Sequence, residues 1–171
     1  MTIIKRKIRR FIPEDFEVTT WETLQPYFQE LQERAIDSEI VLRAWFKDRS
    51  ELESIVSEDM AWRYIHMTCD TANEELVKHY TAFVTDIQPK ISPVSNELNK
   101  KAVASEYLSL LEKEEGYDIM IRNMRTSLEI YRDENVPLKT EIQQASQNYG
   151  QLSGAMSITH EGEELTLQQA G

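Results

Sequence analysis

Apolar residues recur every three or four positions along most of the chain, which is the spacing of one face of an α-helix. Near the C-terminal end the spacing changes to alternation on both sides of Glu161-Gly162, which predicts a β-hairpin. The predicted fold is therefore a mostly all-α helical bundle with a short C-terminal β-hairpin. The expected helices cover residues 19–36, 38–46, 50–70, 71–87, 94–103, 106–113, 117–131 and 135–150.

The stretch from Asp59 to Asp70 differs from the other expected helices because its apolar residues point in every direction around the helix axis. A helix that is apolar all round is buried by neighbours on several sides. We therefore expect this stretch to form the central helix of the bundle, with Trp62 in the core. The acidic Glu51, upstream on the same helix, is expected to be exposed to solvent.

The pattern Ser/Thr-x-x-Glu/Gln predicts the start of a helix, because its first and fourth side chains bond each other's backbone N–H in a capping box. It begins at Thr19, Ser50, Thr71 and Thr166. The box at Ser50 predicts that the central helix is separate from a short helix before it, whose cap is expected to be Ser38.

Two prolines and the last capping box bear on where the helices stop. Pro89 and Pro93 are expected to interrupt the chain's helical course, because proline lacks an N–H and crowds the preceding turn. The helix over residues 135–150 is expected to be polar, since it is rich in glutamine. The box at Thr166 opens a helix only a few residues before Gly171, from which we expect the chain to be a truncated part of a longer protein.

The chain is expected to have three parts: an extended, basic and irregular arm over 1–18, a helical bundle over 19–152, and the hairpin with the start of a truncated helix over 153–171. The net charge is −11, yet the first ten residues carry five basic side chains and no acidic one. The arm is expected to pack on the bundle or on another molecule through its three isoleucines, Ile3, Ile4 and Ile8.

Composition and charge exclude several classes of function. Outside the first ten residues the chain is strongly acidic, whereas a nucleic-acid partner demands clustered Lys and Arg. No apolar run approaches the roughly 20 residues that a membrane helix needs, and the N-terminus lacks the hydrophobic segment of a secretory signal. Cys69 is the one cysteine, so an internal disulfide is impossible and a reducing cytoplasm is the expected location.

His66, Cys69 and Asp70 form the strongest candidate for chemistry, since their spacing places them on one helix face, a geometry that can ligate zinc. We favour the alternative that His66 and Cys69 are core or semi-core residues and Asp70 ends the helix, because the chain offers no second ligand pair. A thiol nucleophile is disfavoured as well, because this spacing supplies no oxyanion hole.

The stretch from His160 to Glu164 has the start of the zinc-peptidase motif His-Glu-x-x-His, but Glu164 stands where the second histidine is required. The motif also requires a helix, and this stretch is expected to be a hairpin tip. His79 is expected to face solvent beside Lys78. The sequence therefore predicts no catalytic, cofactor-binding or metal-ligating residue.

Three segments together resemble a known family: Phe11–Phe28 (FIPEDFEVTTWETLQPYF), Glu58–Asp70 (EDMAWRYIHMTCD), and the closing stretch from Ser153 to Ala170. They are similar to the start of oligoendopeptidase F-like enzymes in the thimet oligopeptidase family, and to the hairpin that follows the N-terminal helices there. The resemblance covers nearly the whole chain with its order preserved.

The resemblance implies a parent zinc metallopeptidase that cleaves short peptides inside a deep channel lined by long helices. It places the zinc and its ligands in a C-terminal catalytic part, so no catalytic or metal residue is carried over to this chain. The expected function is that of a non-catalytic N-terminal helical region that forms part of the channel wall.

A self-sufficient helical protein–protein interaction module without enzymatic activity is the alternative. The partners expected with the first hypothesis are the C-terminal catalytic part and the oligopeptide substrate of the parent enzyme. Nucleic acid and membrane are not expected as partners. Self-association of the chain is expected if its apolar hairpin, from Ala155 to Leu167, has nothing else to cover it.

Overall fold

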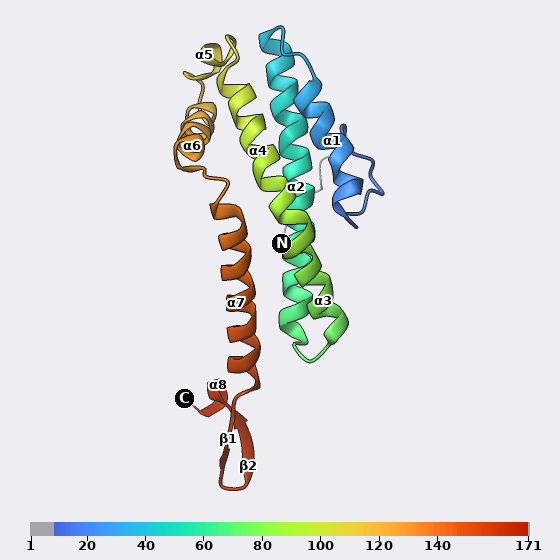
Figure 1. Ribbon diagram of the computed structural model, residues 1–171, viewed down its shortest axis with the longest axis vertical. Coiled ribbons are helices and arrows are strands. Elements are labelled where there is room, and N and C mark those ends of the chain that lie inside the picture. The colour runs from blue at the N-terminus through green and yellow to red at the C-terminus, as the bar shows by residue number, and fades with distance from the viewer. Residues whose placement is uncertain (1–8, 171) are drawn as a thin grey trace, which may run out of the picture.

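The computed structural model describes residues 9–170, and it is an elongated stack of helices that ends in a two-stranded hairpin (Figure 1). The predicted fold class is confirmed. The elements are α1 (Trp21–Glu33), α2 (Glu39–Cys69), α3 (Glu74–Ala82), the π-helical segment η1 (Phe83–Ile87), α4 (Gln88–Val103), α5 (Leu108–Leu111), α6 (Tyr117–Ile130), α7 (Asn135–Ala155), β1 (Ser157–His160), β2 (Glu163–Thr166) and α8 (Leu167–Ala170).

Helix α2 is one unbroken helix, although the sequence predicts two over the same residues. Ser38 caps it as expected, because its hydroxyl accepts a bond of 3.3 Å from the backbone N–H of Val41. The expected cap at Ser50 is wrong: the carbonyl of Ser50 accepts a bond of 2.7 Å from the hydroxyl of Ser54 inside the helix. A four-residue pattern of this kind also occurs by chance inside a helix rich in Ser and Glu. Here the residues on both sides of Ser50 pack against the bundle, so the helix continues through it.

The interruption expected at the prolines is also wrong, because α3, η1 and α4 follow one another without a break. Pro89 lies in the first turn of α4, where a missing N–H costs little, and Pro93 lies inside the helix. In η1 the hydrogen bonds reach one residue further than in an α-helix, as in the bond from the N–H of Gln88 to the carbonyl of Phe83. This wider turn comes directly before Pro89, where the ring would otherwise crowd the preceding carbonyl.

The capping residues of the other helices are mostly neighbours of the expected ones. Asn73, and not Thr71, caps α3 by accepting from the N–H groups of Glu75 and Leu76. Thr20 holds the cap position of α1 without a side-chain bond to the backbone, so the box at Thr19 does not form. The box at Thr166 does form: Thr166 and Gln169 accept from each other's backbone N–H at 3.3 and 3.0 Å.

The main hydrophobic core lies in the upper half of the molecule in Figure 1, between α1, the first half of α2, α4, α5 and α6. Its largest fully buried side chains are Trp45, Phe28, Leu24, Leu31, Leu42, Leu52, Leu98, Leu111 and Ile121. A second, much smaller cluster joins Met67 of α2 to Tyr80 and Val84. Trp62 belongs to neither cluster and is 53% exposed, so its predicted place in the core is wrong.

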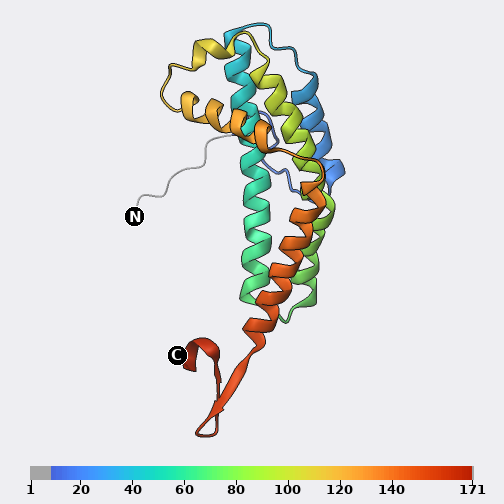
Figure 2. The same cartoon turned by 60° about the vertical axis from the view of Figure 1, so that its left-hand side comes forward.

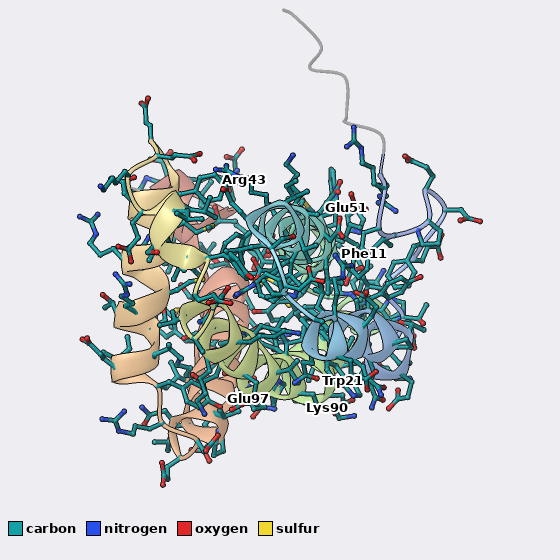
Figure 3. All side chains as sticks on the ribbon, turned by 90° about the horizontal axis from the view of Figure 1, so that it is seen from above. Phe11, Trp21, Arg43, Glu51, Lys90 and Glu97 are labelled. Atoms are coloured by element: carbon teal, nitrogen blue, oxygen red, sulfur yellow. The ribbon has the colours of Figure 1, made fainter. Side chains whose placement is uncertain are left out.

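Residues 9–18 contain no helix or strand but are held firmly against the bundle. The carboxylate of Glu51 accepts hydrogen bonds of 3.0, 2.9 and 2.9 Å from the backbone N–H groups of Arg10, Phe11 and Ile12. Figure 3 shows Glu51 and Phe11 side by side at this junction. Glu51 is therefore partly buried and not freely exposed as predicted. Packing by Ile3, Ile4 and Ile8 lies outside the described residues.

Candidate docking surface

Helix α7 is inverted relative to an ordinary surface helix, because its polar side faces the protein. Each of its side chains is at least partly exposed, and it packs on η1 and α4. Apart from Val136, the half-buried side chains on it are polar: Thr140, Gln143, Gln144, Gln147, Gln151 and Ser153. One hydrogen bond of 3.2 Å runs from the amide of Gln147 to the hydroxyl of Thr81. The glutamines that made this helix look polar in sequence are thus its inner face.

The outer face of α7 is apolar and regularly spaced. Residues on it follow one another at intervals of four, three, four, three and four, which is the 3.5-residue repeat of helices that pair along a seam. The seam residues, all exposed, are Leu138, Ile142, Ala145, Tyr149, Leu152 and Met156. From Ile142 to His160 the chain carries no Asp, Glu, Lys or Arg. An uncharged, regularly spaced apolar face is typical of a surface that pairs with another helix.

The second half of α2, from Val56 to Cys69, exposes large apolar side chains as well. Trp62, Tyr64 and Ile65 are 53%, 50% and 43% exposed. Trp62 lies against the ring of His66, with 5.5 Å between ring centroids. These are the residues that make the helix apolar in every direction, and the protein covers only the side that carries Met67.

The hairpin extends the same half of the molecule beyond the end of α7 (Figure 2). Ile158 pairs with Leu165 across the two strands, and Glu161 and Gly162 form the turn with φ of 52° and 87°. Both turn residues are in the left-handed region that a tight hairpin requires. We call the exposed apolar residues of this half the docking surface: Trp62, Tyr64, Ile65, the α7 seam, Ile158 and Leu167.

Arg63 fixes the second half of α2 in place, on the side away from these apolar residues. Its guanidinium donates to the carboxylate of Asp59 at 2.7 Å, to the carbonyl of Val18 at 2.6 Å and to the carbonyl of His79 at 3.0 Å. Burial raises the pKa of Asp59 above its usual range, although the pairing with Arg63 acts in the opposite direction. The docking surface is thus carried on a helix that is tied both to residues 9–18 and to α3.

The candidates for chemistry do not come together. His66, Cys69 and Asp70 are all exposed at the end of α2, so the expectation that His66 and Cys69 are core or semi-core residues is wrong. Within residues 9–170, no group of three or more His, Cys, Asp and Glu side chains is placed to hold a metal ion. His79 is exposed and His160 lies at the hairpin tip, both as predicted.

Within the described part of the chain, none of the helices is both long and apolar enough to span a membrane. Sequence reasoning missed the docking surface on α7, although the 3.5-residue spacing and the uncharged run were visible, because the glutamines dominated the interpretation of that helix.

The chain matches a protein-family model described as Peptidase M3 N-terminal domain over residues 11–131. The match begins in the segment held by Glu51 and ends directly after α6, so α7 and the hairpin lie beyond it. A search of the curated proteins finds no match, and neither does a search of the solved structures.

Proposed function

Because the chain belongs to the Peptidase M3 N-terminal domain family, we propose that it is the non-catalytic N-terminal helical region of an oligoendopeptidase F-like zinc metallopeptidase. In this proposal it docks on a C-terminal catalytic part and forms part of the wall of the channel in which short peptides are hydrolysed. The family match supports its place in a metallopeptidase. The particular subfamily and the wall function rest on the resemblance of the sequence segments described above.

The inverted helix α7 carries the docking part of this proposal. In α7 the glutamines face the bundle and the uncharged apolar seam faces solvent. Such an exposed apolar face is typical of a helix that is stabilised by contact with another protein part. Trp62, Tyr64 and Ile65 on α2 add aromatic area of the kind that dominates the energy of protein interfaces. A catalytic part that follows the hairpin in one polypeptide is a partner held at high local concentration.

The residues of this chain do not fit the zinc ion that the family implies. His66 and Cys69 are exposed at the end of a helix, and the described residues offer no cluster of ligands around either. The zinc, the general base and the contacts with the scissile peptide therefore belong, in this proposal, to the catalytic part. A cytoplasmic location is part of the same proposal, and it accords with a single cysteine.

The docking proposal is tested by hydrogen exchange on the chain alone and after addition of a separately produced catalytic part of such an enzyme. The amides of residues 61–69 and 138–158 are expected to exchange more slowly in the mixture. A double variant of the seam, Leu138→Gln with Leu152→Gln, is expected to weaken the association at least about tenfold, since two apolar contacts of roughly 1 kcal/mol or more are removed.

Ile40→Gln is the matched control, because Ile40 is an exposed apolar residue at the opposite end of α2. It is expected to leave the association unchanged. Strong protection of residues 138–158 in a dilute monomer, with no change on adding the catalytic part, would instead favour the self-sufficient interaction module. If the complex forms, hydrolysis of peptides of graded length tests the wall function: loss of this region is expected to relax the limit on substrate length.

A further inference from the structure

A cleft lies between α2 and α6, at the end of the molecule opposite the docking surface. Its volume is about 460 Å³, near the lower end of the range for small-ligand sites in proteins. One face of α2 and one face of α6 form its two sides, and Asn99 of α4 lies between them. The lining includes Phe46, Arg49, Asn99, Ile119, Met120 and Met124.

The two sides of the cleft are tied together by contacts of Arg43. The guanidinium of Arg43 on α2 is paired with Glu114, in the turn before α6, through a hydrogen bond of 2.8 Å and a second, shorter one. It also lies over the ring of Tyr117, the first residue of α6, at 5.4 Å from the centroid. Figure 3 shows Arg43 at this junction. These contacts fix the position of α6 relative to α2, and with it the width of the cleft.

Arg49 is the buried cation of this cleft. It is 8% exposed, and its guanidinium stacks over Trp45 with 5.6 Å to the ring centroid. It donates to Glu53 at 2.7 Å, to the side-chain oxygen of Asn99 at 2.7 Å and, weakly, to the sulfur of Met124 at 3.8 Å. These contacts use three of the five N–H donors that a guanidinium carries, which leaves two for a ligand.

The chemistry around Arg49 selects the kind of ligand. A guanidinium binds a carboxylate through charge-assisted hydrogen bonds, which gain strength where water is partly excluded. The Oδ1 of Asn99 accepts from Arg49, so the amide nitrogen of Asn99 remains a donor for the same carboxylate. Beside these polar groups stand Phe46, Ile119, Met120 and Met124, which provide an apolar wall for an adjoining side chain.

We propose that this cleft binds the C-terminal carboxylate of a short peptide whose last residue is apolar, with Arg49 and Asn99 holding the carboxylate. Glu53, which also lines the cleft, accepts from the Nε of Arg49, so the remaining donors are the N–H groups on its two Nη atoms. The proposal rests on the cleft alone. It is independent of docking on a catalytic part, and failure of either leaves the other standing.

The test is NMR of the chain labelled at its methionine methyl groups, titrated with acetyl-Ala-Leu bearing a free carboxylate. The methyl signals of Met120 and Met124 are expected to shift in a saturable manner, because both line the cleft. Met60 and Met67, on the second half of α2, serve as internal controls and are expected to stay in place. The same peptide with a C-terminal amide is expected to bind at least about tenfold more weakly, since it lacks the charge-assisted bonds.

Two further measurements distinguish binding of a C-terminal carboxylate from binding of any carboxylate or any anion. A peptide amide with an internal aspartate tests whether any carboxylate suffices, and equal binding by it would overturn the assignment to a C-terminus. Arg49→Lys keeps the charge but loses the planar fork, and is expected to weaken binding about tenfold. Arg125→Lys, at an exposed ion pair with Glu112, is the control that should bind normally.

Three results would overturn the proposal outright: equal response to acid and amide, shifts at Met60 and Met67 in place of Met120 and Met124, or no shift at millimolar peptide. Because Arg49 is buried, the methyl spectrum of Arg49→Lys without peptide is first compared with that of the unsubstituted chain, which shows whether the fold is kept. The comparisons of the acid with the amide and with the internal aspartate use the unsubstituted chain, so they do not depend on the folding of any variant.

Discussion

The two halves of helix α2 have similar apolar content but opposite surroundings. In the half from Glu39 to Ile55, the large apolar residues are mostly buried, and Trp45 is 0% exposed. In the half from Val56 to Cys69, Met67 is buried while Trp62, Tyr64 and Ile65 are open to solvent. The first half is surrounded by α1, α4, α5 and α6, whereas the second half packs mainly on α3.

The difference teaches that burial along a helix is decided by its neighbours and not by its own pattern. A helix that is apolar in every direction is built to be covered. In the first half of α2 the covering elements belong to the same core, and in the second half the docking surface is left open. Each of the following predictions bears on this contrast between an anchored half and an open half.

The largest difference is expected between the two tryptophans. Trp45→Ala should lower the free energy of unfolding by about 3–5 kcal/mol, because it empties a fully buried site. It also removes the hydrogen bond of 2.8 Å that the indole N–H of Trp45 donates to the carbonyl of Leu31. Trp62→Ala should cost less than about 1 kcal/mol, as at other open surface sites. Urea unfolding of both variants measures the difference, and equal losses would remove the contrast between the halves.

The next largest effect is expected at Arg63, which anchors the open half. Arg63→Met should lower the free energy of unfolding by about 2 kcal/mol, because it removes bonds to one carboxylate and two carbonyls. Asp59 then loses its cation, so its pKa rises further. The loss should therefore grow as the pH rises through the folded-state pKa of Asp59, which lies above the ordinary aspartate value of 3.8. Arg122→Met, at an exposed position of α6, is the control, and an equal loss there would contradict the anchoring function.

Glu51 offers a pH-dependent test in the anchored half. Burial tends to raise its pKa, but three backbone N–H groups lower it, and the net pKa lies below the ordinary value of 4.5. Its stabilising effect is therefore complete above pH 4.5 and is lost as the pH falls through the folded-state pKa. Glu51→Gln should cost about 1.5 kcal/mol at pH 7 and progressively less in acid. Unfolding curves recorded between pH 7 and pH 3 check this, and a loss independent of pH would count against it.

The smallest effect is expected on the α7 seam of the isolated chain. Leu138→Gln with Leu152→Gln should change the free energy of unfolding by no more than about 0.5 kcal/mol, because both side chains are exposed. The melting temperature of the pair, measured at low protein concentration, tests this. A loss comparable to that of Trp45→Ala would mean that the seam is already covered, and the docking surface would have to be abandoned.

Much of the fold could be predicted because its signals are local. The helical periodicity, the cap at Ser38, the turn at Glu161-Gly162 and the box at Thr166 each depend on a few neighbouring residues, and all appear in the structure. The prolines and the box at Ser50 predicted helix ends that do not occur, because those ends depend on contacts beyond the neighbouring residues. Packing along the full length of a helix outweighs a local stop signal, so α2 passes through Ser50 and α4 includes Pro93.

The candidate site was less predictable, since it depends on which face of each helix is left uncovered. The apolar residues of the second half of α2 predicted a helix buried on several sides, whereas the structure covers one side of it and leaves Trp62, Tyr64 and Ile65 exposed. The sequence carries no sign of which side is covered. On α7 the glutamines predicted a polar helix, but the sequence carries no sign that they face the bundle. The partners of Glu51 lie about 40 positions away in the chain, so the sequence carried no local sign of that contact.

The uncharged run from Ile142 to His160 has a kinetic consequence for a chain whose net charge is −11. Charged surfaces accelerate encounter by long-range attraction, and that acceleration disappears as salt is added. A seam without charges adds no local attraction of this kind, so its encounters are expected near the ordinary rate of roughly 10⁵–10⁶ M⁻¹s⁻¹. Added salt should leave that rate nearly unchanged or raise it slightly, if the partner is acidic too. In the proposed two-part enzyme, a covalent link between the parts would replace that attraction by raising their local concentration.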